Sequence, residues 1–286
     1  MENSSEARQL ASSYLITASE EEHRRMITLA RRLGPALRDM CARADIRADY
    51  RVIDVGCGPI GALVDLAEIV GPHGAVVGID SSADAIATAE SILAELAVPN
   101  VTVLHGDINT VELARVHHGR LFDAAHMRLV LMHQPDPSAT LRRVSKLLRP
   151  GGRILVADLL DDPTYPWFEP PVPATRRALE VMWEGIRRRG GSPDLGRRMG
   201  AVCAAAGLEV VDCRPFAVME APDAVLETLE STLRGSRRTI LEFGVATDAE
   251  VRTLEAAIAG AKRRSYTGFV GPLIIQTIAR LPEMAI

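Results

Sequence analysis

Between Arg51 and Ala157 the chain alternates short apolar segments with stretches of helical periodicity, and this alternation is the strongest constraint on its fold. Strands that alternate with helices form right-handed βαβ units, which make a parallel sheet covered by helices on both faces. The sequence therefore predicts an α/β protein with a Rossmann-like sheet. The expected strands are 51–55, 75–80, 101–104, 121–127 and 153–157, with a helix stop predicted at Arg149-Pro-Gly-Gly152.

The remainder of the chain follows a different pattern. Residues 162–173 contain five prolines, which exclude a regular helix there. Two further strands are expected at about 208–216 and 269–281, with helices between them. We therefore predict an N-terminal helical lid over residues 1–45, followed by one domain over 46–286. Its cap elements are expected at about 162–200 and 222–263.

Composition narrows the classes of partner. The 33 Lys and Arg residues against 37 Asp and Glu residues give a net charge of −4, which disfavours a nucleic-acid partner. The apolar runs are shorter than a membrane span requires and no signal peptide is recognised, so we expect a cytoplasmic chain without a membrane partner. The four cysteines lack the spacing of a zinc site, and no metal site is predicted. Homodimerisation is an expectation that no residue pattern specifies.

A glycine-rich turn follows the first expected strand. Gly56, Gly58 and Gly61 have the spacing GxGxxG and stand between a strand and a helix. Glycines at such a turn permit a tight bend and a close approach of the backbone to a ligand. Nicotinamide dehydrogenases and S-adenosylmethionine (SAM) methyltransferases both use this geometry, so the turn alone leaves both classes open.

Three acidic residues at the ends of the first three strands favour the second class. Asp54 precedes the glycines and suits the cationic amino group of SAM, whereas it would repel a pyrophosphate. Asp80 can accept hydrogen bonds from a ribose diol. Asp107 can accept from the exocyclic amine of adenine, with Ile108 beside the ring. The alternative is that these residues serve only as turn residues.

These motifs resemble those of the class I SAM-dependent methyltransferases, of the small-molecule type that includes ubiquinone-biosynthesis and natural-product enzymes. The resemblance covers about 110 residues, from Tyr50 to Asp158. It implies a seven-stranded sheet of order 3-2-1-4-5-7-6 with an antiparallel seventh strand, SAM as the cofactor and S-adenosylhomocysteine as its product. Many members have glycine where this chain has Ile60, which we expect to pack at the start of the helix. The segments that carry the resemblance are Asp54-Val-Gly-Cys-Gly-Pro, Gly-Ile-Asp80, Gly-Asp107-Ile and Phe122-Asp-Ala-Ala-His-Met-Arg128-Leu-Val-Leu-Met-His133-Gln-Pro-Asp136-Pro.

The resemblance extends to the cofactor site. Tyr14 looks like the tyrosine of an N-terminal lid that folds over bound SAM, although it could equally be a surface or core tyrosine of a flexible arm. The residues expected to bind the cofactor are Tyr14, Asp54, Gly56, Gly58, Asp80, Ser81, Asp107, Ile108, Arg128 and His133.

Two residues after the fourth strand are the catalytic candidates, because ligands of such sheets lie beyond the carboxyl ends of the strands. His133 is the first candidate for a general base, since neutral imidazole is available near pH 7. His126 is the second, at a strand position. Alternatively, His133 bonds only to the cofactor or the backbone. Arg128 is expected to orient the carboxylate of SAM or the substrate, unless it forms a surface salt bridge.

The scarce aromatic residues point to the substrate side. Tyr165, Trp167, Phe168 and Trp183 cluster in the sequence, which predicts a cover over an apolar or aromatic ligand; ordinary packing is the alternative. We therefore predict methyl transfer to O, N or a nucleophilic C, such as that of an indole, of a small secondary metabolite. The alternatives are a quinone-type C-methyltransferase of primary metabolism, or a SAM-fold cyclase or partner subunit that transfers no methyl group.

Overall fold

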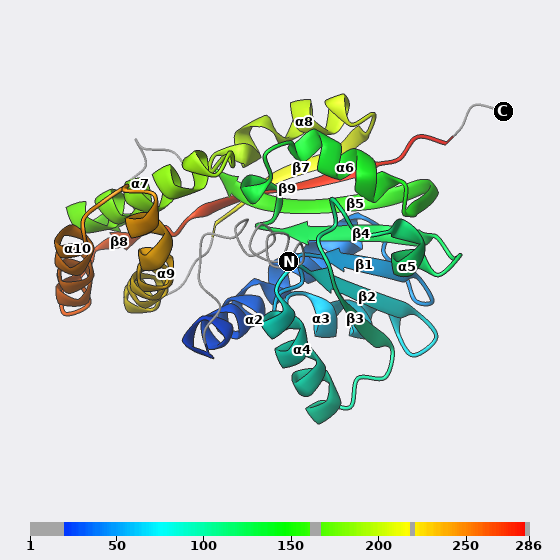
Figure 1. Ribbon diagram of the computed structural model, residues 1–286, viewed down its shortest axis with the longest axis horizontal. Coiled ribbons are helices and arrows are strands. Elements are labelled where there is room, and N and C mark those ends of the chain that lie inside the picture. The colour runs from blue at the N-terminus through cyan, green and yellow to red at the C-terminus, as the bar shows by residue number, and fades with distance from the viewer. Residues whose placement is uncertain (1–19, 161–166, 218–220, 284–286) are drawn as a thin grey trace, which may run out of the picture.

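The computed structural model describes residues 20–160, 167–217 and 221–283, and every structural statement below concerns these ranges. Within them the main sheet has seven strands in the order β3-β2-β1-β4-β5-β9-β7 (Figure 1). β9 runs antiparallel to β5 and β7, and the other neighbouring strands are parallel. Counted along this sheet alone, the order is 3-2-1-4-5-7-6, so the predicted fold class is confirmed. The strands are β1 (Arg51–Val55), β2 (Ala75–Asp80), β3 (Val101–His105), β4 (Phe122–Arg128), β5 (Leu148–Leu160), β7 (Glu209–Ala217) and β9 (Leu273–Arg280).

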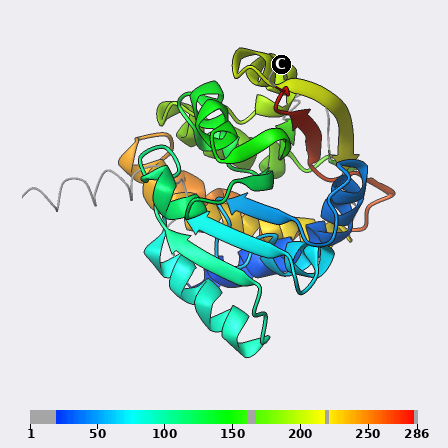
Figure 2. The ribbon, with the colours of Figure 1, turned by 90° about the vertical axis from the view of Figure 1, so that its right-hand side faces the viewer.

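Helices cover both faces of this sheet (Figures 1 and 2). α3 (Leu63–Val70) and α4 (Ala83–Glu95) pack on one face, and α6 (Pro137–Ser145) and α8 (Met199–Ala205) pack on the other. The central strands are consequently buried on both sides, and Ile53 has no exposed surface. Ile60 is also buried in the core near the start of α3, as expected. The short helix α5 (Leu113–His117) follows β3.

A long helix, α2 (Glu20–Arg43), precedes the sheet and corresponds to the helical part of the predicted lid. Its buried face carries Leu33, Leu37 and Met40 at helical spacing. The backbone carbonyl of Ala36 accepts a hydrogen bond of 2.9 Å from Nε2 of Gln276 on β9. The side chain of Arg43 bonds to Gln276 and to Asp212 on β7. The helix is therefore fastened to the last strands of the chain.

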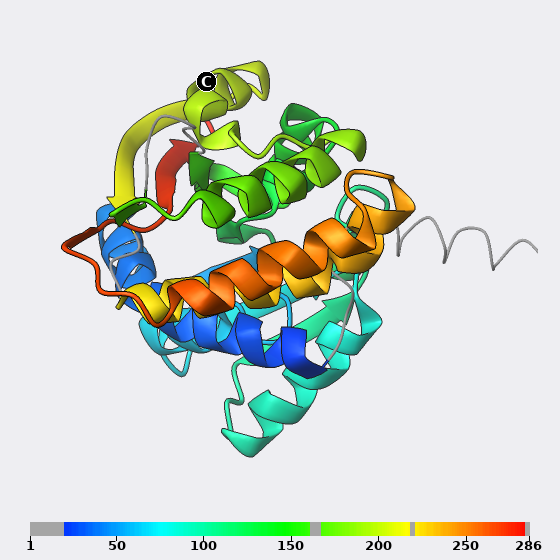
Figure 3. The same cartoon turned by 90° about the vertical axis from the view of Figure 1, so that its left-hand side faces the viewer.

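Three helices form a cap beside the carboxyl ends of the strands: α7 (Pro173–Arg188), α9 (Pro222–Glu242) and α10 (Asp248–Ala261). Figure 3 shows α9 and α10 lying between α2 and α7. Arg177 on α7 and Glu250 on α10 form an ion pair at 2.6 Å. Nη1 of Arg32 on α2 donates to Oγ1 of Thr228 on α9 at 2.8 Å. The ion pair therefore holds α7 against α10 within the cap, and the Arg32–Thr228 hydrogen bond attaches α2 to α9.

Two boundaries differ from the prediction. Arg149-Pro-Gly-Gly152, predicted as the stop of the preceding helix, lies inside β5, because α6 already ends at Ser145; the register of β5 with β4 shifts between Phe122 and Ala124. The N–H of Gly151 donates to the carbonyl of Leu281, so these glycines form an irregularity inside the strand. The expected strand 269–281 is divided into β9 and β8 (Gly268–Phe269), and β8 pairs with β6 (Phe168–Glu169) in a separate sheet. No helix in the ranges described above is long and apolar enough to cross a membrane.

Candidate functional site

The glycine turn after β1 is closely packed and adopts a backbone conformation that disfavours residues with a side chain. Gly56 and Gly58 have φ values of +70° and +56°, in the left-handed region. A Cβ on Gly56 would lie 2.4 Å from Cγ2 of Val130, and one on Gly58 would lie 2.5 Å from Cε of Met26. The backbone of the turn therefore packs against α2 and the segment after β4, and we call this arrangement the glycine cradle.

The side chain of Asp54 connects the glycine turn to β4 and to the start of α3. Its carboxylate lies 2.7 Å from Nδ1 of His126, its register partner on β4, and accepts a hydrogen bond of 3.1 Å from the N–H of Ala62. Because a carboxylate only accepts, Nδ1 is the ring nitrogen that carries the proton. The Asp54 side chain is only 3% exposed. Its geometry fixes the turn against α3 and β4, and its predicted contact with a cofactor stays a prediction.

Asp80 lies at the end of β2, where the sequence predicts the ribose acid. Oδ2 accepts from the N–H of Gly58 at 2.8 Å, and Oδ1 accepts from the N–H of Ser82 at 2.8 Å. Burial raises the pKa of this carboxyl, and the two amide bonds oppose that rise. The backbone carbonyl of the neighbouring Ser81 lies 3.1 Å from Nε2 of His105. Asp80 thus positions the second glycine of the cradle.

Asp107 lies beyond the end of β3 and has one oxygen engaged. Oδ1 accepts from the backbone N–H and the side-chain Nδ2 of Asn109, at 2.9 and 3.1 Å. Oδ2 has no hydrogen bond within residues 20–160, 167–217 and 221–283. The adjacent Ile108 is buried. Sequence reasoning missed Asn109, although the Asp-x-Asn spacing of a loop that bonds to itself was visible in the sequence.

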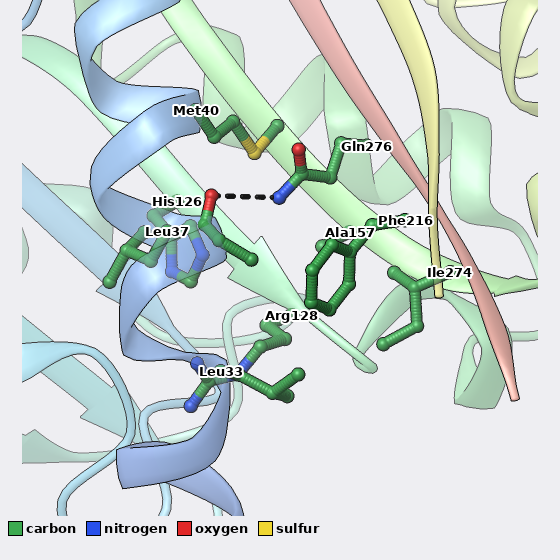
Figure 4. Close-up of a pocket in the computed structure, with 10 residues that line it drawn as sticks. Leu33, Leu37, Met40, His126, Arg128, Ala157, Phe216, Ile274 and Gln276 are labelled. Carbon is green, nitrogen blue, oxygen red and sulfur yellow. Dashed lines mark hydrogen bonds between the residues drawn. The ribbon is translucent and has the colours of Figure 1, made fainter. Parts of the chain in front are cut away.

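Arg128, the last residue of β4, lines a small cavity beneath α2 (Figure 4). The cavity encloses about 10 Å³, close to the room that a single water molecule needs. Among the residues that the structure describes, none bonds to Nη1 of Arg128. Burial lowers the pKa of this guanidinium, and Asp54 and Asp65 oppose that shift. A buried guanidinium nitrogen without a partner suits an anionic group. The apolar walls are Leu33, Leu37, Ala157, Phe216 and Ile274.

His133 has different surroundings from Arg128. It lies in the short helix η1 (Leu131–His133), and its Cα would be 3.3 Å from a Cβ on Gly191, just beyond α7. Burial lowers its pKa to about 4, and the charge of Arg189 acts in the same direction. The imidazole is therefore neutral at pH 7 but is a weak base. His126, the second candidate, is buried on β4 as expected and bonded to Asp54.

A further ionisable group, Asp158, lies near the carboxyl end of β5. Asp158 has no exposed surface, and neither of its oxygens forms a well-aligned hydrogen bond within the described ranges. Burial raises its pKa to about 8, although the backbone N–H groups of Met132 and Leu131 oppose the shift. The acid is therefore largely protonated at pH 7.

The aromatic residues predicted to cover the substrate are mostly part of the core. Phe168 is 2% exposed and stacks at a tilt on Tyr266, with 5.0 Å between the ring centroids. Trp183 on α7 is 8% exposed, and Trp167 is partly buried against the same cluster. Tyr165, like Tyr14 of the lid, lies outside the described residues. Contact of the four predicted residues, Tyr165, Trp167, Phe168 and Trp183, with a substrate stays a prediction.

These features fit the cofactor that the sequence implies. SAM carries a carboxylate, a cationic amino group, a ribose diol and an adenine amine. The site offers a cradle without Cβ atoms, the acids Asp80 and Asp107 at neighbouring strand ends, and the unpartnered nitrogen of Arg128. These groups match the cofactor in charge and in hydrogen-bonding character.

Comparisons with known proteins agree with this geometry. Residues 46–180 match the model of a methyltransferase domain family. The chain is 33% identical over 198 residues to an uncharacterized 37.1 kDa protein in a transposon of Streptomyces fradiae, covering 66% of this chain and 53% of that protein. It is 27% identical over 132 residues to the demethylmenaquinone methyltransferase of Shouchella clausii, covering 46% of this chain and 54% of the enzyme.

The structural comparison concerns the fold. A putative methyltransferase from Bacillus halodurans superposes with a TM-score of 0.56 at 16% identity, covering 86% of this chain and 98% of the other. The chain spans about half the length of the two curated relatives named above. The family match, the curated relatives and the sheet order together support a class I, SAM-dependent methyltransferase domain over residues 46–180.

Proposed function

We propose that the protein transfers a methyl group from SAM to an oxygen, nitrogen or nucleophilic carbon of a small, apolar or aromatic secondary metabolite. The observation that carries this proposal is the arrangement at one edge of the sheet. The glycine cradle, Asp80 and Asp107 follow three neighbouring strands, and Arg128 ends the fourth with a buried unpartnered nitrogen.

Each of these residues has a role in binding. The amides of the cradle approach the cofactor, Asp80 accepts from the ribose diol and Asp107 accepts from the adenine amine. Arg128 pairs with a carboxylate of the cofactor or of the substrate. When bound, SAM supplies an electrophilic methyl carbon on a good leaving group. The residues of this chain orient the acceptor and exclude water, which can account for several kcal/mol of the barrier.

The substrate side of the proposal rests on the cap. α7, α9 and α10 pack together beside the site and continue the apolar core of the sheet. An insert of two helices before the last strand, together with α2, supplies enclosing surface that a minimal cofactor domain does not need. These features favour a small apolar acceptor of secondary metabolism.

A second candidate is a C-methyltransferase that acts on a quinone precursor. It is favoured by the likeness to an enzyme named demethylmenaquinone methyltransferase. Both candidate functions use the same cofactor site, so an experiment must identify the methyl acceptor to distinguish them.

Methyl-labelled SAM tests the proposed function directly. The protein is incubated with a panel of phenols, amines, indoles and reduced quinones, and labelled products are separated. Calorimetry should show binding of SAM and S-adenosylhomocysteine and none of NAD. Labelled indole or phenol supports the first candidate, and labelled quinol supports the second. Absence of SAM binding would contradict both.

Replacement of Asp80 by alanine is expected to weaken SAM and S-adenosylhomocysteine by about 10- to 100-fold. The variant loses the acceptor for the ribose diol and the bond that holds Gly58, and a bond to a charged acceptor contributes about 1.5–3 kcal/mol. Calorimetry measures both dissociation constants. Asp84→Ala, an exposed acid on α4, is the matched control and should bind normally. Unchanged affinity in Asp80→Ala would remove the ribose assignment.

The pH dependence of turnover tests His133 as the base. A base must be deprotonated, and burial lowers the pKa of this imidazole to about 4. The acidic limb of kcat/KM is therefore expected near pH 4 rather than 6.5, and His133→Ala should lower kcat. Rates of the wild type and the variant are compared from pH 4 to 8. Full turnover of the variant with intact SAM affinity would exclude the base role.

A further inference from the structure

The loop after β3 is tied to the segment after β4 by a single asparagine. Nδ2 of Asn109 donates to Oδ1 of Asp107 at 3.1 Å and to Oε1 of Gln134 at 2.8 Å. Oδ1 of Asn109 accepts from Oγ1 of Thr140 at 2.8 Å. Its backbone N–H also donates to Asp107 at 2.9 Å. One side chain therefore contacts three polar groups from two separate segments.

The chemistry of these contacts fixes the orientation of the amide. A carboxylate oxygen only accepts, so it must face the NH₂ group of Asn109, and the hydroxyl of Thr140 then meets the amide oxygen. Thr140 is only 1% exposed, and its hydroxyl also lies 3.3 Å from the backbone carbonyl of Asp136, a longer contact than the 2.8 Å to Asn109. Asn109 cannot rotate without breaking several of these bonds at once.

The same contacts determine which oxygen of Asp107 remains for a ligand. Oδ1 already accepts two hydrogen bonds from Asn109, whereas Oδ2 accepts none in the described part of the chain. A carboxylate held in this way presents one fixed acceptor. It favours a ligand that offers an N–H at that point and disfavours one that offers an oxygen lone pair.

We propose that Asn109 is a positioning residue that aims Oδ2 of Asp107 at the exocyclic amine of the cofactor's base and sets the discrimination between an amino and an oxo group there. The inference rests on the proposed function, because it takes the Asp107 loop as the adenine side of the site. Asn109 also donates to Gln134, the residue that follows His133. It therefore fixes the Asp107 loop to the turn that carries His133, the candidate base.

The test compares two ligands that differ at one position of the base. S-adenosylhomocysteine carries an amine there, and S-inosylhomocysteine carries an oxygen. By calorimetry, the wild type should bind the adenosyl ligand about 10- to 100-fold more tightly. Asn109→Ala should reduce this ratio at least fivefold, roughly one lost bond to a charged acceptor.

A matched control and a milder variant complete the test. Asn100→Ala removes an asparagine just before β3, at the opposite end of that strand, where it donates to the carbonyls of Ala67 and Gly71. It should leave the ratio unchanged. Thr140→Val removes only one contact of Asn109 and should lower the ratio by a smaller factor, which keeps the test usable if Asn109→Ala does not fold.

The outcomes separate the two proposals. Equal weakening of both ligands in Asn109→Ala, with the ratio intact, would show a merely structural role and overturn the inference. A wild type that binds neither ligand would instead contradict the proposed function. A ratio that falls in Asn109→Ala and Thr140→Val but not in Asn100→Ala supports the inference.

Discussion

Replacement of Asp54 by alanine is expected to lower the free energy of unfolding by about 2–5 kcal/mol, because two buried donors lose their acceptor and each unsatisfied donor costs about 1–3 kcal/mol. The substitution leaves the ring of His126, only 2% exposed, without its partner at 2.7 Å. It also removes the acceptor for the N–H of Ala62, at the start of α3. A buried donor that loses its acceptor retains its full desolvation cost.

Urea unfolding at pH 7 measures this effect. Asp54→Asn should cost less than Asp54→Ala, because its amide oxygen can still accept one hydrogen bond. Asp84→Ala, on the exposed face of α4, should change stability by less than about 1 kcal/mol. An Asp54→Ala protein within 1 kcal/mol of the wild type would contradict the assigned role.

Replacement of Asp158 by asparagine is expected to stabilise the protein increasingly as the pH rises. The folded pKa of this acid is raised to about 8 by burial, whereas the unfolded chain ionises near pH 4. Between these values the unfolded state loses its proton and the folded state keeps it. The wild type therefore loses about a factor of ten in its folding constant for each pH unit.

The difference between Asp158→Asn and the wild type isolates this group. It should grow by about 4 kcal/mol between pH 5 and pH 8 and level off above pH 8. His133 acts in the opposite sense in the wild type: its lowered pKa means that stability is lost as the pH falls from about 6.5 to 4. Urea unfolding at four pH values measures the trend. A difference independent of pH would contradict the assignment.

The sequence predicts the sheet because its signals are local. Each strand is a short apolar run, and Gly56 and Gly58 stand where positive φ angles favour glycine. The acids Asp80 and Asp107 follow from their positions at strand ends. Parallel strands carry such residues to one edge, so their position at that edge could be predicted without knowledge of tertiary contacts, and their contact with a cofactor stays a prediction.

The catalytic side depended on contacts that the sequence does not encode locally. Leu129 has a φ of +56°, an uncommon conformation for leucine, and the chain changes direction there. His133 consequently lies against the end of α7, while Arg128 lines the cavity beneath α2. The burial of Asp158 depends on distant packing: a Cβ on Gly196 would lie 3.0 Å from the Asp158 carbonyl oxygen. Such packing cannot be read from a strand pattern.

The attachment of α2 has a consequence for synthesis on the ribosome. The helix is synthesised before the strands of the sheet, yet its partners Thr228 and Gln276 follow 196 and more than 230 residues later. Until β9 has emerged, Leu33 lacks its neighbour Ile274, whereas Leu37 and Met40 cluster with residues of β1 and α3 that follow directly in the chain. Contacts so distant in sequence form late, so the attachment of α2 to the last strands is completed only after β9 has been synthesised.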